Sequence, residues 1–458
     1  MKKYLYPLMM FLLIFQMNKL TAQEENKLKL SGEILSDQRF LLNDDIPWAW
    51  NENRLSLNLD KKITDKSKLY TEVWIRNFGL PAYNSAYDLY NKGIIDPYNI
   101  EIREAYFKVT GFIINDLDLK IGRQRIAWGT ADKLNPTDNL NPYDFEDILD
   151  FGRHRGSDAV SLDYWINEKF SIHGSYIPFY QPANLPVGIF SDVLSQPFIV
   201  PEGITIKSMN DTLITPAYNL AESSIAGIKL KGLVGSFDFS LSYVWGRDGL
   251  PYVNYNTFIP ADMTGGVDIN SHLQFARTHI FGFDLAGNLG GIGVWAEAAG
   301  YLPDTEVHMI NNLSALYPMS PVPVIQDSIL LKKEVYYKFV IGMDYFFTNG
   351  SYINFQYLHG FIHEQGNENM NDYFFLNYDI KFFEERLMIR PIGGGFIVSD
   401  WGEIKNNYSL VYIPEISYKA TDNAKISIGA AIFEGNGNNI FSNFSEKNMF
   451  ILKATYSF

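Results

Sequence analysis

The side chains with the most distinctive chemistry lie in residues 120–165, where arginine, carboxylate, amide and proline residues are closely spaced. Guanidinium groups bind carboxylates and phosphates through paired hydrogen bonds. The arginines here therefore suit an anionic group on a solute. They equally suit an internal ion-pair network with the acidic run at 144–150, and the two alternatives are compatible. The candidate constriction and solute-binding residues are Arg123, Arg125, Trp128, Asp138, Arg153 and Arg155, with Arg76 and Lys108 from neighbouring segments.

Amphipathic segments must position these residues. At the C-terminus, Phe450, Leu452, Ala454, Tyr456 and Phe458 fall on one face of a strand whose other face is mixed or polar. Alternation of this kind suits a wall between lipid and a wet lumen. About 18 such segments of roughly 8 to 14 residues follow from the sequence, near the length of a tilted membrane-spanning strand. The terminal aromatic resembles the signal that outer-membrane proteins present to their insertion machinery.

The connections between these segments alternate in length. Turns near 64–67, 111–115, 232–235 and 348–350 are short. The connections between them are long, near 36–53, 78–99, 127–155, 179–222, 247–275, 302–333, 361–371, 399–405 and 435–446. Transmembrane barrels have short periplasmic turns and long extracellular loops. We therefore predict an all-β fold, a transmembrane antiparallel β-barrel of about 18 strands (16 to 18), with its loops segregated in this way.

Two of the long loops are predicted to shape the pore. Pro136 and Pro142 fix turns in the loop 127–155, which favours a stiff constriction folded into the lumen. The loop 179–222 is the longest and is rich in proline, so it is a candidate lid. A barrel of 16 to 18 strands leaves an aqueous channel unless such loops block it.

The constriction segment also carries a family resemblance. Gly122, Arg123 and Gln124 end a strand, Trp128 and Gly129 follow, and an Asn-Pro pair and an aspartate precede the next strand. This arrangement resembles a segment of porin-like outer-membrane proteins related to the alginate-export family, over about 45 residues. The resemblance implies passage of a polyanionic sugar through a lumen rich in Arg and Lys. This chain departs from that pattern, since its predicted inner wall is close to charge-balanced.

The N-terminus and the composition indicate export. Lys2 and Lys3 precede an apolar run at 4–15, and small residues up to Ala22 follow, which is typical of a signal peptide spanning 1–22. Residues 23–458 are then predicted to form a single barrel domain in the outer membrane of a Gram-negative bacterium. Cysteine is absent and aromatic residues reach 15%, which fits a barrel with aromatic girdles. The net charge of -14 argues against nucleic-acid binding.

These observations predict a porin-type channel for passive passage of small polar or anionic solutes, with sugar-related solutes among them. The alternative is a structural or accessory barrel of an outer-membrane complex with a loop-blocked lumen. No enzymatic activity is predicted, since no nucleophile elbow or comparable motif is present. His359 and His363 are too far apart along a strand to share a metal. Oxygen ligands at 132–150 lack EF-hand spacing, so no metal or cofactor is predicted.

The predicted partners are the lipid bilayer and lipopolysaccharide, the insertion machinery through the strand ending in Phe458, and a small polar solute. The oligomeric state stays open.

Overall fold

The computed structural model describes residues 28–43, 47–191, 205–262, 265–437 and 439–458. The predicted signal peptide, 1–22, and residues 192–204 of the candidate lid lie outside the described residues.

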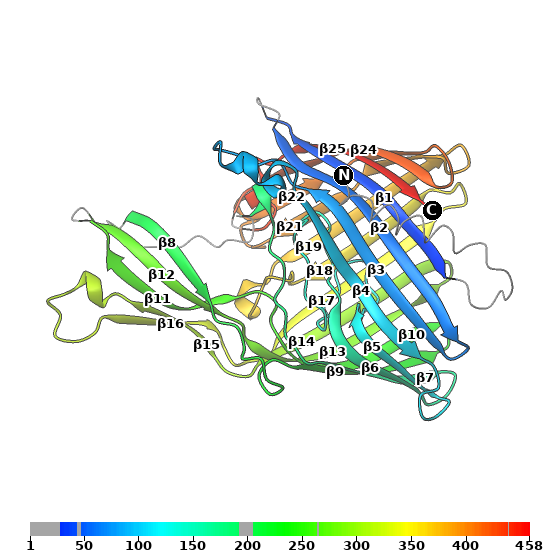
Figure 1. Cartoon of the computed structure of the whole chain (residues 1–458), viewed down its shortest axis with the longest axis horizontal. Helices are drawn as coiled ribbons and strands as arrows, with labels where there is room; N and C mark the ends of the chain where they lie inside the picture. The colour runs from blue at the N-terminus through cyan, green and yellow to red at the C-terminus, as the bar shows by residue number, and fades with distance from the viewer. Residues whose placement is uncertain (1–27, 44–46, 192–204, 263–264, 438) are drawn as a thin grey trace.

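Eighteen antiparallel wall strands form a closed barrel (Figure 1), as the alternating pattern predicted. Two of these wall strands each have one interruption: β20 and β21 together form one, and β22 and β23 together form the other. The wall consists of β1 (Lys29–Leu41), β2 (Trp48–Thr64), β3 (Ser67–Phe78), β4 (Tyr98–Val109), β5 (Leu117–Gln124), β6 (Ser157–Trp165), β7 (Phe170–Ile177), β9 (Ile225–Val234), β10 (Phe237–Arg247), β13 (Arg277–Leu289), β14 (Ile292–Pro303), β17 (Tyr336–Phe346), β18 (Tyr352–His359), β19 (Asp372–Phe382), β20 (Leu387–Ile392), β21 (Gly394–Val398), β22 (Tyr408–Tyr412), β23 (Glu415–Lys419), β24 (Ala424–Gly435) and β25 (Met449–Ser457).

The barrel closes between its first and last strands. β1 pairs with β2 on one side and with β25 on the other. Gly32 and Phe458 exchange two backbone hydrogen bonds of 3.0 Å at the periplasmic end of this seam. A Cβ atom on Gly32 would lie 2.2 Å from the Ser56 carbonyl oxygen and 2.8 Å from the Phe458 ring, so only glycine fits there without displacement.

The outer face of the barrel is apolar. Leu452 and Tyr456 of β25 and the following Phe458 are exposed on it, together with Ile34 of β1 and Ile75 of β3. An apolar outer band on a closed antiparallel barrel is the arrangement that satisfies every backbone group within lipid. The protein is therefore an integral outer-membrane β-barrel. Among the described residues, no helix is long and apolar enough to cross a membrane.

A second sheet extends outward from the barrel on the extracellular side (Figure 1, left). Its strand order is β16-β15-β11-β12-β8, and two of its pairings, β11 with β15 and β8 with β12, are parallel and join different loops. The connections 179–222, 247–275 and 302–333, predicted as loops, therefore contain strands, because distant loops pair with one another. The strands are β8 (Thr205–Leu213), β11 (Tyr252–Pro260), β12 (Gly266–Gln274), β15 (Val307–Asn312) and β16 (Ile325–Leu331).

The first predicted loop, 36–53, is also shorter than expected. β1 continues to Leu41 and β2 begins at Trp48, so most of that stretch is wall strand. The helices are single turns in the connections: η3 (Asp88–Tyr90), α2 (Lys92–Ile95), η4 (Gly188–Phe190), η5 (Ser314–Leu316), η6 (Asn367–Asn369), η7 (Ile404–Asn406) and η8 (Ser442–Phe444).

The extracellular half of the lumen contains a core. Two clusters of buried apolar side chains combine wall residues with residues of the connections. The connection between β5 and β6 supplies Leu134, Phe145 and Ile148 to one cluster and Trp128 and Leu140 to the other. The loop after β5 therefore lies inside the barrel, where it packs as a protein core does.

Candidate functional site

Residues 125–156, which we call the inserted segment, cross the lumen. They contact Arg39 on β1 at one side and Glu297 on β14 at the other. In the order of wall strands, β1 and β14 are separated by at least eight positions in either direction. A third contact joins the backbone N–H of Asp132 to the side-chain oxygen of Gln356 on β18. The inserted segment is thus fixed to distant parts of the wall.

Arg39 forms the first attachment. Its guanidinium donates two hydrogen bonds to the carboxylate of Asp147, at 2.8 and 2.5 Å, and two to that of Asp37, at 3.1 and 2.8 Å. Arg39 is 1% exposed, so the pairing is shielded from water. Burial by itself would raise the pKa of Asp147, but the charge and hydrogen bonds of Arg39 lower this pKa well below its usual range.

Arg76 forms the second attachment, from β3. It binds the carboxylate of Glu146 through two hydrogen bonds of 2.7 and 2.8 Å, the fork geometry in which arginine pairs most strongly with a carboxylate. Its Nε donates to Asn99 at 3.1 Å, and Glu101 lies 3.2 Å away. The sequence predicted Arg76 as a constriction or solute-binding residue, and in the structure it holds the inserted segment.

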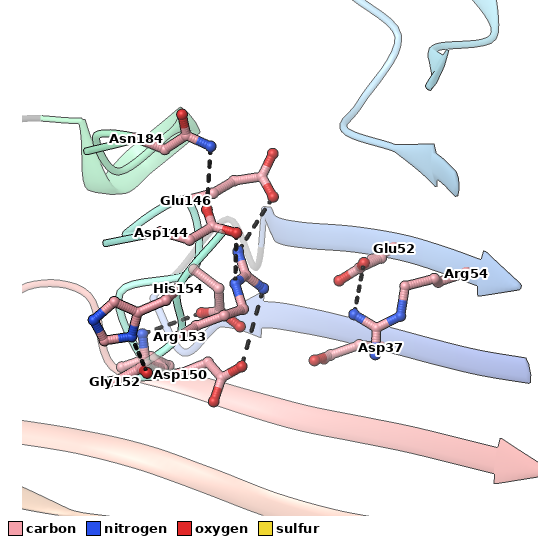
Figure 2. Close-up of polar contacts among 12 residues, drawn as sticks. Asp37, Glu52, Arg54, Asp144, Glu146, Asp150, Gly152, Arg153, His154 and Asn184 are labelled. Atoms are coloured by element: carbon pink, nitrogen blue, oxygen red, sulfur yellow. Dashed lines mark hydrogen bonds and ion pairs between the residues drawn. The ribbon is translucent and has the colours of Figure 1, made fainter. Parts of the chain in front are cut away.

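Arg153 lies at the centre of the acidic run (Figure 2). Its guanidinium is 3.1 Å from Asp144, 3.3 Å from Glu146 and 4.0 Å from Asp150. Burial would lower the pKa of Arg153, but the surrounding carboxylates raise it above its ordinary value. Arg103 on β4 also binds Asp144, at 2.9 Å. Arg153 therefore belongs to an ion-pair network, one of the two alternatives that the sequence left open.

Arg125 and Asp138 fasten the inserted segment to itself. Both terminal nitrogens of Arg125 bond the Asp138 carboxylate. One of them also donates to the side-chain oxygen of Asn141 at 3.1 Å, and that oxygen accepts the Ile126 N–H at 2.6 Å. Asp138 is 2% exposed. These contacts fix the first turn of the segment where it leaves β5.

Glu297 is the attachment on the far wall. One carboxylate oxygen accepts the backbone N–H groups of Thr130 and Ala131, at 2.5 and 2.6 Å, and the amide of Asn135 at 2.8 Å. The other accepts the Thr137 hydroxyl at 2.9 Å. The partners of Glu297 lie about 160 residues earlier in the chain, so no local sequence pattern marks this site.

Trp128 packs the segment against the wall. It is 3% exposed, and a Cβ atom on Gly227 of β9 would lie 2.8 Å from its ring. The ring meets His173 edge-on at 6.0 Å between centroids, and the Lys229 ammonium lies 5.7 Å from its centre. Trp128 is a buried contact of the inserted segment, with no face open to a solute.

Three predicted residues take no part in these attachments. Arg123 is on the outer face of β5, because the neighbouring Gln124 is the inward, buried residue; it pairs with the exposed Asp158 at 3.0 Å. The expectation that Arg123 faces the lumen is corrected. Lys108 is inward but near the periplasmic end of β4, where it pairs with Asp118 at 3.1 Å. Arg155 donates to the Pro182 carbonyl at 2.6 Å and lies beside the wall.

The sequence missed Arg39 and Arg103 as attachments. Both alternate with an acid on the same inward face, Asp37 before Arg39 and Glu101 before Arg103, and each arginine bonds that acid. An arginine two residues after an acid in a strand was therefore a pattern that could have identified these two attachments.

The two halves of the lumen differ. On the extracellular side, a cavity of about 70 Å³ beside the inserted segment, lined in part by Pro136, Tyr301 and Lys338, has room for only a few waters. On the periplasmic side, inward charges stay partly exposed, and several are paired loosely across strands. These charges are Asp60, Lys68, Glu72, Glu104, Lys108, Lys120, Asp163 and Lys231.

His359 hydrogen-bonds the Asp372 carboxylate at 2.8 Å. In the described ranges no group of three or more His, Cys, Asp or Glu side chains is placed to hold a metal ion.

Comparisons with known proteins give barrels of low similarity. No family model matches the chain, so the resemblance to the alginate-export family is not shown, and no curated protein matches it. Solved structures that resemble it include OccK11 (OpdR) of Pseudomonas aeruginosa, at 10% identity and a TM-score of 0.48, with 96% of this chain and 99% of that chain covered.

A second is OmpT, an outer membrane protein of Vibrio cholerae, at 10% identity and a TM-score of 0.42, with 96% of this chain and 100% of that chain covered. A third is OmpF of Salmonella typhi in complex with daunomycin, at 10% identity and a TM-score of 0.41, with 96% of this chain and 99% of that chain covered. At this level the likeness says nothing about solute or activity.

Proposed function

We propose that the protein is a porin-type channel for passive passage of small polar or anionic solutes, sugar-related solutes included, and that it has no catalytic role. The observation that carries the proposal is the inner wall of the periplasmic half, where charged side chains of both signs remain partly exposed. Eighteen strands enclose a lumen wider than side chains alone can fill. A mixed, hydrated lining suits polar solutes, and the described part of the wall offers no ring of one charge that would exclude either sign of ion.

In this proposal the inserted segment is the constriction. It is held by buried ion pairs and hydrogen bonds on three parts of the wall, and the cavity beside it is too small for a sugar. Passage then requires the segment to move from its attachments. The charged network sets how often this happens.

A structural or accessory barrel is the second candidate. The two apolar clusters within the lumen and the outward sheet favour it, because such packing and such a projection also suit a blocked barrel that displays a surface to partners. The bilayer, lipopolysaccharide and the insertion machinery that reads the strand ending in Phe458 are proposed partners in either case.

Planar-bilayer recording of the full chain distinguishes the two. We expect current steps in KCl, and blocking of these steps by added oligosaccharides or uronic acids. Arg76→Gln, which weakens one attachment, is expected to increase openings. Lys405→Gln, which removes one positive charge from an exposed extracellular turn, is the matched control. A barrel that stays closed at all voltages in both variants would favour the structural role.

A further inference from the structure

The barrel wall has a notch beside the extracellular end of β4. Residues 98–104 of β4 pair with β3 on one side, whereas β5 pairs only with residues 105–109. β5 ends at Gln124 and β6 begins at Ser157, so in the described part of the chain no strand covers the free side of residues 98–104. Uncovered strand edges keep backbone groups available to a partner.

A cavity of about 440 Å³ occupies this notch, within the size range of small-molecule sites. It opens on the outer face, since the lining residues Ile100 and Ile102 point outward and are 64% and 52% exposed. Tyr98, exposed on the same face and nearer the strand's extracellular end, has the place of an interfacial aromatic. The cavity is lined by Ile100, Glu101, Ile102, Arg103, Arg123, Arg155, Gly156, Gln181 and Asn184.

The lining holds three arginines and one acid, Glu101. Arg103 is bound to Asp144 and Glu101, and Arg123 to Asp158. Arg155 has no carboxylate within 4.0 Å among the residues described, and its Nε is buried without a hydrogen-bond partner. Arg155, whose Nη2 donates to the Pro182 carbonyl, is therefore the one arginine of the three with no carboxylate partner in the described part of the chain to neutralise its charge.

We propose that this notch binds the phosphate group of an outer-leaflet amphiphile. Arg155, whose charge no carboxylate in the lining neutralises, binds the phosphate, and Arg123, whose Nε and Nη2 are held by Asp158, adds positive charge beside it. The apolar part lies against Ile100 and Ile102 on the outer wall.

The position of the notch favours a lipid source for the phosphate over a dissolved ion. Its mouth is on the lipid-facing side of the wall, and apolar residues flank it there: Ile121 of β5 and Val160 of β6 are 45% and 40% exposed. A free phosphate would gain nothing from such surroundings, whereas an acyl chain would. Asp158 faces the same side, but its charge is matched by Arg123.

The test is isothermal titration of the full chain, refolded in detergent, with three probes: lipid A, enzymatically dephosphorylated lipid A and inorganic phosphate. We expect lipid A to bind and its dephosphorylated form to bind at least about tenfold more weakly. The double variant Arg123→Gln/Arg155→Gln should lower lipid A affinity by a similar factor, because each charge-assisted hydrogen bond contributes enough for such a change. Lys405→Gln should bind as the wild type does.

Two controls show that a loss of binding is not a loss of fold. Arg155→Lys keeps the charge, and heat-modifiable gel migration reports barrel closure. Equal binding of the two lipid A forms, or full affinity in the folded double variant, would overturn the proposal. Inorganic phosphate that binds as tightly as lipid A would overturn the lipid source. Failure of the channel proposal leaves each of these results unchanged.

Discussion

Glu297→Gln gives the sharpest test of the inserted segment's attachment. The carboxylate accepts at least four short hydrogen bonds from residues 130–137. An amide keeps one acceptor oxygen but loses the charge, and its NH2 group meets the Thr137 side of the site, where donors point inward. The substitution leaves the size of the side chain nearly unchanged.

The expected cost follows from these bonds. Hydrogen bonds to a charged group contribute about 1.5–3 kcal/mol, and neutral ones about 0.5–1.5 kcal/mol. Losing the charge on four bonds that share one carboxylate, which do not add fully, costs about 3 kcal/mol. Since each 1.4 kcal/mol is a factor of ten, the undocked fraction of the inserted segment should rise roughly a hundredfold.

Single-channel recording measures this directly, as the frequency and length of openings, and limited proteolysis of the inserted segment supports it. The matched control is Asp344→Asn on β17, an inward acid bound by Tyr352 and not by the inserted segment. The reasoning would be refuted if Glu297→Gln showed the same openings and the same protease resistance as the wild type, because the attachment would then contribute nothing to docking.

Three further predictions concern the seam, the core and pH. Gly32→Leu should prevent β1 from closing normally against Phe458, and we expect loss of the heat-modifiable band. A normal band would show that the pairing of β1 with β25 accommodates the larger side chain. Trp128→Ala should cost about 3–5 kcal/mol of unfolding free energy in urea titration, as large aromatic deletions in cores do; a change below 1 kcal/mol would contradict its packing. Arg39 lowers the pKa of Asp147 in the folded protein, so the stability that this ion pair contributes is complete above the unfolded-state pKa of about 3.9. This stability is lost only as pH falls through the lower folded-state pKa. Opening frequency should therefore stay constant from pH 7 to about pH 4, and a rise centred above pH 4 that Asp147→Asn removes would contradict this.

The barrel was predictable because the sequence pattern that indicates it lies within each strand and each loop. Each wall strand reports its lipid face by simple alternation, as Leu452, Tyr456 and Phe458 do, and loop length reports the side of the membrane. Arg123 was misplaced because it was grouped with the arginines of the loop that follows β5, whereas its neighbour Gln124 takes the inward position. Alternation applied strictly to β5 would have placed Arg123 outside.

The inserted segment's attachments were less accessible, because they depend on contacts between distant residues. Pro136 and Pro142 predicted a stiff loop, but nothing near residue 297 in the sequence indicates that its carboxylate accepts Thr130 and Ala131. The outward sheet was missed for the same reason, since β8 pairs with β12 about 60 residues later. Pairing between loops leaves no periodic signal in either one.

A reversible lock of the inserted segment tests most directly whether it controls passage. A Cβ atom on Gly282 of β13 would lie 3.3 Å from the Cβ of Thr137, slightly closer than the roughly 3.5–4.5 Å of a disulfide, and 2.3 Å from the Ser242 hydroxyl, which must rotate away. The chain has no cysteine of its own. Single-channel current would be recorded from the Thr137→Cys/Gly282→Cys variant, oxidised and then reduced in the same membrane. We predict that openings are absent when it is oxidised and return on reduction. Identical currents in the two states would contradict the account.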